Sequence, residues 1–243
     1  MDESLDGAQR VAFFSGSFDP PHLGHLAVAR AARAALGLDT VLFAPVGAQP
    51  LKPLGSTASF EDRFAMTRLA IGGERGFAVS LADAPKPSGG PNFTLDTLVG
   101  LRARLPPEAS LFCVMGADSF FGLRQWHRSA EIPFVAPLIV ASRPGQQLDD
   151  LKAALPAGLT MESAPGLHTI RSGADVEAYC LRNPGGETSL LYLLPGLHVD
   201  ISASQVRDRI REQAGARTSA PTAGDDLLPK AVLDYIRSHG LYR

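Results

Sequence analysis

Short apolar runs alternate along the chain with stretches whose apolar residues recur at helical spacing. The apolar runs predict β-strands at Val11–Phe14, Thr40–Ala44, Ala78–Leu81, Leu111–Met115, Leu138–Ala141 and Leu190–Leu193. The helical patterns predict helices that begin near His22, Phe60, Leu95, Gln147, Ala203 and Lys230. Such alternation is typical of an α/β fold, in which helices cover a mainly parallel sheet.

The remaining segments predict loops and a division of the chain. Gly47–Ser59 and Ala84–Pro91 are rich in Gly, Pro and Ser and follow predicted strands, where open α/β sheets bind their ligands. Residues 156–189 and 215–226 are irregular, and the second stretch is expected to be a flexible loop. We expect one domain over residues 1–243. It would comprise a doubly wound, Rossmann-like core at 10–195 and a small C-terminal helical part at 196–243.

The turn after the first predicted strand carries two histidines, in Gly16–His25, which reads Gly-Ser-Phe-Asp-Pro-Pro-His-Leu-Gly-His. His22 and His25 are three residues apart, so both imidazoles project from one face at a helix start. A helix start also offers unpaired N–H groups and a positive dipole end, which favour phosphate. This arrangement indicates chemistry on a phosphate ester. Metal binding ranks lower, because Asp19 is the only acidic or Cys neighbour.

Other phosphate-binding patterns are missing, and the composition narrows the function classes. No G-x-G-x-x-G follows the first strand, and the sequence holds no Walker loop. The formal net charge of −2 disfavours general nucleic-acid binding, which needs a basic excess. A hydrophobic fraction of 45% over 243 residues can fill a sizeable core.

The two cysteines and the N-terminal segment bear on where the protein is expected to be located. Cys113 and Cys180 belong to no C-x-x-C and have no third partner, so we expect two reduced thiols. The polar, acidic Met1–Asp6 is unlike a signal peptide, and no apolar run approaches a membrane span. We therefore expect a cytoplasmic protein without a membrane partner. No oligomeric state is predicted.

A second candidate anion site opens the helix near Ala203. Ser202 and Gln205 have the spacing of a capping box. Ser204 and Arg207 share a face near the same helix start, so a hydroxyl, a guanidinium and N–H groups come together there. Taken alone, the segment also fits a well-capped surface helix.

The two motifs together, Gly-x-Phe-Asp-Pro-x-His-x-Gly-His and Ile-Ser-x-Ser-x-x-Arg, resemble the nucleotidylyltransferase superfamily. Within it the chain is similar to the bacterial nicotinate mononucleotide adenylyltransferase family. Further stretches resemble that family in the same order: Phe60–Met66, Phe93–Leu98, Gly116–Asp118, Trp126–His127, Arg143–Gly145 and Val232–Tyr242. Each match is short, and their order makes the resemblance specific.

The resemblance implies a transfer in NAD biosynthesis that joins ATP and nicotinate mononucleotide into nicotinate adenine dinucleotide and releases pyrophosphate. A phosphate oxygen of the mononucleotide attacks the α-phosphorus of ATP without a covalent enzyme intermediate. His25 is assigned to the α-phosphate, His22 to the adjacent phosphates, and Ser204 with Arg207 to the β,γ end. His25, His22 and Arg207 are the expected catalytic residues, with Mg²⁺ bound to ATP by phosphate oxygens and water. The implied ATP-binding residues are Gly16, Ser17, Phe18, His22, His25, Ser202, Ser204 and Arg207.

The resemblance also implies an acceptor subsite. Thr94 and neighbouring N–H groups would bind the nicotinate carboxylate, and Trp126 would stack on the pyridine ring. Backbone N–H near His127 would select the carboxylate over an amide, because an acid-selective site needs donors only. Asp118 would accept from a ribose hydroxyl, and Lys52 would reach the substrate phosphate. From the residues alone, Thr94 is the N-cap of a helix beginning at Leu95.

Departures from the family pattern leave alternatives open. Ser15 stands for the usual first glycine, Ser17 for a common threonine, and Leu51 for a histidine before the loop lysine. Ala203-Ser204 changes a common Ser-Thr pair but keeps the hydroxyl at position 204. The alternatives are nicotinamide mononucleotide or phosphopantetheine as acceptor, a nucleotide-binding regulator without turnover, and a metal hydrolase using the two histidines.

Overall fold

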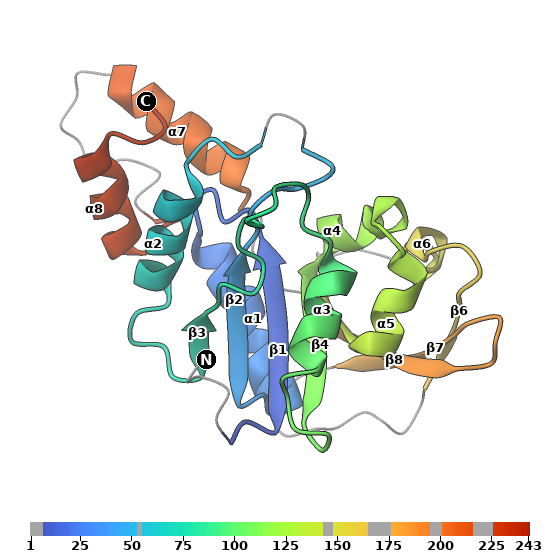
Figure 1. Ribbon diagram of the computed structural model, residues 1–243. Coiled ribbons are helices and arrows are strands. Elements are labelled where there is room, and N and C mark those ends of the chain that lie inside the picture. The colour runs from blue at the N-terminus through green and yellow to red at the C-terminus, as the bar shows by residue number, and fades with distance from the viewer. Residues whose placement is uncertain (1–6, 53–54, 143–147, 165–175, 195–200, 216–225) are drawn as a thin grey trace.

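A computed structural model describes residues 7–52, 55–142, 148–164, 176–194, 201–215 and 226–243. Its centre is an eight-stranded sheet in the order β3-β2-β1-β4-β5-β8-β7-β6 (Figure 1). The strands are β1 (Arg10–Gly16), β2 (Thr40–Pro45), β3 (Phe77–Val79), β4 (Ser110–Gly116), β5 (Leu138–Ala141), β6 (Thr160–Ser163), β7 (Glu177–Arg182) and β8 (Thr188–Leu194). Neighbouring strands from β3 across to β8 are parallel, and β7 runs antiparallel to β8 and β6. The mainly parallel, Rossmann-like α/β fold is confirmed.

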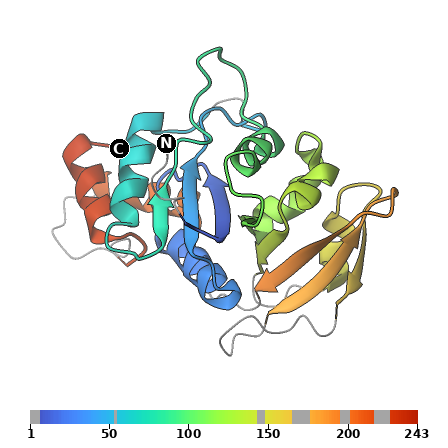
Figure 2. The same ribbon diagram turned by 60° about the horizontal axis from the view of Figure 1, so that its bottom comes forward.

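Helices cover both faces of the sheet, with α1 on one face and α3, α4 and α5 on the other (Figure 2). Alternate residues of β1 join two separate cores: Phe13 packs in a cluster with Leu98 of α3, and Ala12 in a cluster with Ala29 of α1. This alternation is how a buried strand serves two layers. The helices are α1 (Leu23–Leu36), α2 (Phe60–Ala70), α3 (Thr94–Arg102), α4 (Ala117–Phe121), α5 (Ile132–Val135), α6 (Leu148–Ala154), α7 (Ala203–Gly215) and α8 (Lys230–His239), with 3₁₀ turns η2 (Leu123–Gln125) and η3 (Ser129–Glu131).

In Figure 1, α8 lies beside α2 at the β3 end of the sheet, and α7 runs above both helices. A third hydrophobic cluster joins the three helices, with Met66 from α2, Val206 from α7, and Val232 and Ile236 from α8. The predicted division of the chain at residue 196 stays a prediction. Contacts between α2 and α8 tie the C-terminal helices to the rest of the chain.

The structure corrects one region and leaves others outside its description. Residues 156–189 were expected to be irregular, yet β6 and β7 extend the sheet there by antiparallel pairing. Only Met161 of β6 is buried, so this edge strand has no apolar run that could reveal it. Gln147, Arg143–Gly145 and most of the 215–226 loop lie outside the described residues.

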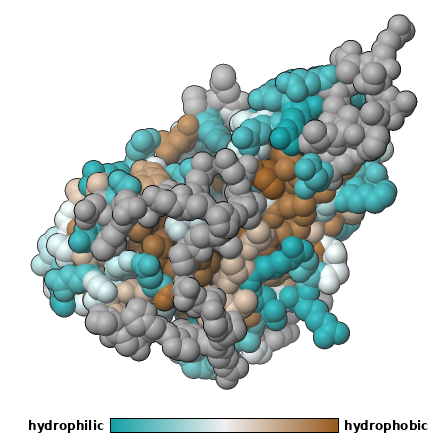
Figure 3. Space-filling view, turned by 180° about the vertical axis from the view of Figure 1, so that it is seen from behind, coloured by the Kyte–Doolittle hydropathy of each residue, from teal (hydrophilic) through white to brown (hydrophobic). Residues whose placement is uncertain are grey.

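Seen from behind, apolar residues gather in the middle of the surface and hydrophilic residues lie around them (Figure 3). No helix within the described ranges has the length and apolarity that crossing a membrane requires.

The loops after β2 and β3 touch at Gly47, where no side chain fits. A Cβ there would lie 2.4 Å from the backbone nitrogen of Pro85. Gly47→Ala is therefore expected to push the two loops apart and lower the free energy of unfolding by about 1–3 kcal/mol, as overpacking does. Chemical unfolding at equilibrium measures this change.

The matched control for Gly47→Ala is Gly100→Ala. Gly100 lies inside α3 and has room for a methyl group, since apart from its chain neighbours and the backbone of its own helix no atom lies within 4 Å of the position that a Cβ would take. The control should raise the free energy of unfolding by about 0.5–1 kcal/mol through helix propensity. Equal effects of the two substitutions would contradict the close approach of the loops.

Candidate active site

A cavity of about 810 Å³ opens where β1 and β4 end, at Gly16 and Gly116. Strand β1 leads into α1 on one face and β4 into α4 on the other, so the cavity lies at the switch point of the sheet. Every predicted site residue lines it. These are Gly16, Ser17, Phe18, His22, His25, Lys52, Thr94, Asp118, Trp126, His127, Ser202, Ser204 and Arg207.

The two histidines stack face to face at the start of α1, with ring centroids 3.7 Å apart. The backbone N–H of His22 donates to Nδ1 of His25 at 3.1 Å. Because Nδ1 accepts this hydrogen bond, the neutral His25 ring carries its proton on Nε2 and presents that N–H as a donor. The Nδ1 of His22 is buried without a protein partner.

The surroundings of the pair favour neutral rings. Phe18 packs edge-on against His25, with centroids 4.9 Å apart. Burial lowers the pKa of His22 to about 4. Burial, and then the neighbouring His22, lower the pKa of His25 well below its usual value. Each ring is thus uncharged near pH 7 and acts through its hydrogen bonds.

Fewer backbone donors are open at the start of α1 than the sequence indicates. The N–H of His22 is held by His25, and the N–H of Leu23 donates to the carbonyl of Leu227 at 2.9 Å. The expectation of unpaired N–H groups at these two positions is wrong, because a histidine cap and a distant loop satisfy them. Side chains therefore carry more of any anion contact.

The second motif meets the first directly. Ser202 and Gln205 form the expected capping box, with Ser202 N–H on Gln205 Oε1 at 2.8 Å and Gln205 N–H on Ser202 Oγ at 3.2 Å. One turn on, Arg207 Nη1 donates to the main-chain carbonyl of Asp19 at 2.7 Å. Arg207 Nη2 donates to Ser204 Oγ at 3.2 Å, and its Nε is buried without a protein partner. The two segments that were each predicted to bind an anion are therefore in direct contact, through Arg207 and Asp19.

The turn Ser17–Asp19 is held from several sides by residues that the sequence analysis gave no role. Arg63 of α2, 2% exposed, donates Nη1 to the Ser17 carbonyl at 2.7 Å and Nη2 to the Val46 carbonyl at 2.8 Å. Phe18 takes a φ of 47°, uncommon for a bulky residue, and its ring is fully buried. An arginine within an apolar helical pattern was the available signal for Arg63.

Lys52 reaches the same turn. Its Nζ donates to Ser17 Oγ at 2.7 Å, and that hydroxyl donates to Gln49 at 3.1 Å. Partial burial, and then the positive charge of Arg207, lower the pKa of Lys52. The neighbouring Leu51 is 51% exposed at the cavity wall. The lysine thus lies at the Ser17–Asp19 turn, on the same side of the cavity as Arg207.

The other side of the cavity is aromatic. The rings of Phe93 and His127 stack with centroids 4.3 Å apart, and Trp126 packs in part against the main core. Helix α3 begins at Thr94 with Phe93 as its N-cap. The prediction that Thr94 caps the helix is wrong by one residue, because helical geometry starts before Leu95. Asp118 lies in the first turn of α4.

Ser15, the departure beside the histidine turn, is tied to a buried carboxylate. Its Oγ donates to Asp83 at 2.6 Å, and Thr97 donates to the other Asp83 oxygen at 2.9 Å. Asp83 is 2% exposed, and burial raises its pKa. The hydroxyl at position 15 is therefore engaged by Asp83, which lines the cavity too. Sequence reasoning passed over Asp83, which stands in a loop without a motif.

Neither thiol is paired: Cys113 and Cys180 are free, and burial raises the pKa of Cys113 to about 12. In the ranges that the structure describes, no group of three or more His, Cys, Asp or Glu side chains could hold a metal ion.

His22→Gln is expected to weaken the acid sensitivity of folding. Between pH 6.5 and about 4 the unfolded chain binds more protons at His22 than the folded protein, so stability falls as the pH drops through this range. From pH 7 to pH 5 this loss is about 2 kcal/mol for His22, and the variant should lack it. Urea unfolding at the two pH values measures it; identical pH dependence in both proteins would contradict the buried, neutral His22.

Comparisons with known proteins come from sequence and structure. A sequence model of the cytidylyltransferase-like family matches residues 13–209. A Gloeobacter violaceus protein named as a probable nicotinate-nucleotide adenylyltransferase is 37% identical, covering 96% of both chains. A Stenotrophomonas maltophilia protein of the same name is 38% identical, covering 95% of this chain and 96% of its own.

Among solved structures, the fold is similar to Plasmodium falciparum nicotinic acid mononucleotide adenylyltransferase complexed with NaAD. The TM-score is 0.65 at 15% identity, covering 96% of this chain and 97% of the other. The same Plasmodium enzyme complexed with APC has a TM-score of 0.63. These structures share the fold of this chain.

Proposed function

The chain belongs to the cytidylyltransferase-like family and, within it, to the nicotinate-nucleotide adenylyltransferases, and from this premise we propose how its cavity works. The protein joins ATP and nicotinate mononucleotide into nicotinate adenine dinucleotide, a step of NAD biosynthesis, and releases pyrophosphate. One observation carries the proposal: Arg207 of the second motif is hydrogen-bonded to Asp19 of the first, across one cavity at the switch point of the sheet.

The reaction needs alignment and charge stabilisation. An oxygen of the mononucleotide phosphate attacks the α-phosphorus of ATP, a new P–O bond forms, and the bond to the β-phosphate oxygen breaks with its electrons leaving on pyrophosphate. Preorganised donors around the developing charge supply most of the catalysis in such transfers. No covalent enzyme intermediate is required.

At the donor end we assign His25 to the α-phosphate. Its Nε2–H is fixed as a donor by the Nδ1 hydrogen bond, so the ring does not need to reorient. His22 contacts the adjacent phosphates, and Ser204 and Arg207 hold the β,γ end. Both rings act as neutral hydrogen-bonding groups, and the positive charge beside the leaving pyrophosphate comes from Arg207.

At the acceptor end the pyridine ring lies against Trp126. Thr94 and backbone N–H groups near His127 bind the carboxylate, and these donors favour an acid over an amide. Asp118 accepts from a ribose hydroxyl. Lys52 is held at the Ser17–Asp19 turn by its hydrogen bond to Ser17, and its ammonium group binds the attacking phosphate.

We propose that Mg²⁺ enters with ATP, coordinated by phosphate oxygens and water. The side chains that donate to the Ser17–Asp19 turn fit this mode, because Lys52, Arg63 and Arg207 are cations and do not coordinate a metal ion. The carboxylate of Asp19 already accepts from two backbone N–H groups and a tyrosine hydroxyl. A cytoplasmic location is part of the same proposal, since ATP is supplied there.

The acceptor is tested by offering the purified protein ATP with nicotinate mononucleotide, nicotinamide mononucleotide or phosphopantetheine, and by following pyrophosphate release. The nicotinate form should have the highest kcat/KM, by at least about tenfold over the amide. Excess EDTA should stop turnover, and added Mg²⁺ should restore it. Equal use of the amide would contradict the acid-selective subsite, and no turnover with any acceptor would favour a binding protein.

His25→Ala should lower kcat by about 100- to 1,000-fold, the usual loss for one preorganised donor to a developing charge. The replacement removes the acceptor of the His22 N–H, so the melting temperature is measured beside kcat and should show a folded protein. His239→Ala, on the exposed end of α8, is the matched control and should keep full turnover. Near-normal activity of His25→Ala would refute the catalytic assignment.

A further inference from the structure

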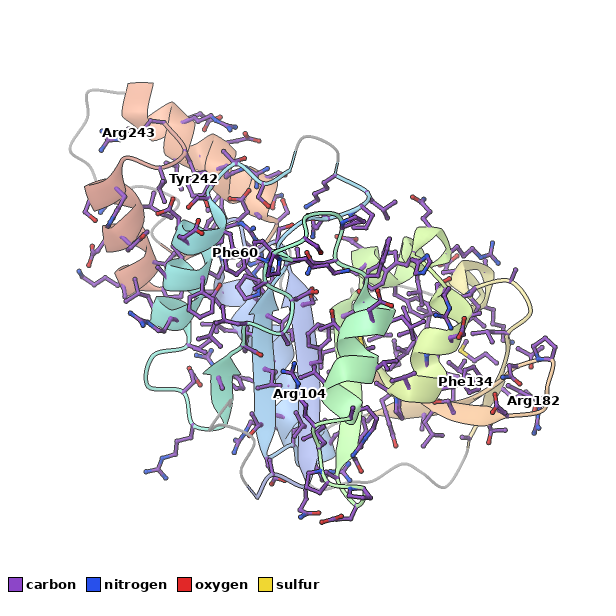
Figure 4. The ribbon with its side chains drawn as sticks, viewed as in Figure 1. Phe60, Arg104, Phe134, Arg182, Tyr242 and Arg243 are labelled. Atoms are coloured by element: carbon purple, nitrogen blue, oxygen red, sulfur yellow. The ribbon has the colours of Figure 1, made fainter. Side chains whose placement is uncertain are left out.

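We propose that Tyr242 is a positioning residue for ATP: its hydroxyl holds the Asp19 carboxylate and thereby fixes the turn against which Arg207 is placed. This inference rests on the proposed binding of ATP. It assigns a part in that binding to a residue that does not line the cavity. Tyr242 follows α8, and in Figure 4 it lies between α7 and α2.

The contact is short and buried. Tyr242 is 5% exposed and Asp19 is 4% exposed, and the tyrosine hydroxyl donates to Asp19 Oδ1 at 2.7 Å. The ring packs in the cluster that joins α2, α7 and α8, with Met66 and Val206 among its members. Tyr242 takes a φ of 63°, so the backbone there is bent to bring the side chain inward.

Asp19 joins three segments through its side chain and its carbonyl. Oδ2 accepts from the N–H of Thr57 at 2.6 Å, and Oδ1 accepts from the N–H of Ala58 at 3.1 Å. The main-chain carbonyl of the same residue accepts from Arg207. The carboxylate and the carbonyl belong to one residue, so the contacts that anchor the side chain also help to hold the carbonyl that accepts from Arg207.

The tyrosine is a stable donor. Burial raises the pKa of its phenol, and the negative charge of Asp19 raises it further, so the hydroxyl stays protonated. Two cations lie close enough to affect it, Arg207 and Arg63, and both are held on carbonyls of the turn. Without the hydroxyl, the carboxylate would compete with these carbonyls for a guanidinium, and Arg207 is the one that lines the cavity.

Tyr242→Phe tests the proposal against a matched control, Tyr235→Phe. Tyr235 lies in α8 and also donates to an aspartate, Asp62 Oδ1 at 2.9 Å, but Asp62 is part of α2 and has no place at the turn. We expect Tyr242→Phe to weaken ATP binding and raise its KM by at most roughly tenfold. The hydrogen bond that is lost lies within the protein, and only the part of its energy that differs between the free and the ATP-bound protein affects binding. The KM for the acceptor should stay within about twofold, and Tyr235→Phe should leave both constants unchanged.

Calorimetric binding of ATP is measured beside turnover, so that the result stands apart from the choice of acceptor. If nicotinate mononucleotide is not the substrate, the wild type shows no turnover with it. The ATP affinities of the wild type and Tyr242→Phe can still be compared by calorimetry, and that comparison tests the role of Tyr242. An unchanged ATP constant in folded Tyr242→Phe overturns the proposal. So does a loss that affects ATP and acceptor equally, because that pattern is general destabilisation.

A double-mutant cycle with Asp19→Ala tests the route through Asp19, because alanine removes both oxygens that the carboxylate offers to Tyr242, Thr57 and Ala58. If Tyr242 acts through this carboxylate, Tyr242→Phe should weaken ATP binding much less in the Asp19→Ala background than in the wild type. Full additivity overturns the route. Should Tyr242→Phe not fold, Asp19→Ala alone decides: weaker ATP binding at an unchanged acceptor KM supports the proposal, and unchanged ATP binding overturns it.

Discussion

The site depends on the hydrogen bond from Arg207 to the main-chain carbonyl of Asp19, which joins residues 188 positions apart. The turn Ser17–Asp19 exposes carbonyl groups and a carboxylate inside the protein, and each needs a donor. Arg63, Arg207 and two backbone N–H groups supply most of them. Of these donors, Arg207 also lines the cavity, so one residue both holds the turn and faces the site.

The sheet explains why these groups meet. Strand β1 lies in the middle of the parallel strands, with β2 on one side and β4 on the other, so its end faces the loops of both neighbours. The loop after β2 brings Lys52 to Ser17, and the loop after β3 brings Asp83 to Ser15. Polar side chains from separate loops thus share one edge of the sheet, where the strands no longer pair.

Features with a local cause could be predicted from the sequence. The strands near Val11, Thr40 and Leu138 coincide with apolar runs of the sequence. The capping box of Ser202 and Gln205 is recognisable because it depends only on two residues three positions apart. The two histidine rings lie side by side because His22 and His25 are three residues apart at a helix start. Features caused by distant partners could not be predicted: β6 exists because β7 pairs with it, and Arg63 is buried because the turn offers it two carbonyls. The N–H of Leu23 is likewise taken by Leu227, which no local pattern announces.

The long separations at Asp19 have a consequence for synthesis of the protein on the ribosome. At about 10 residues per second, Arg207 emerges about 20 s after Asp19, and the hydroxyl that reaches Asp19 comes from 223 positions away. The parallel strands can pair before then, because β1, β2 and β4 all lie in the first half of the chain. A growing chain can therefore form the strands around the cavity early, while the Ser17–Asp19 turn gains its contacts with Arg207 and Tyr242 only when the last helices have docked.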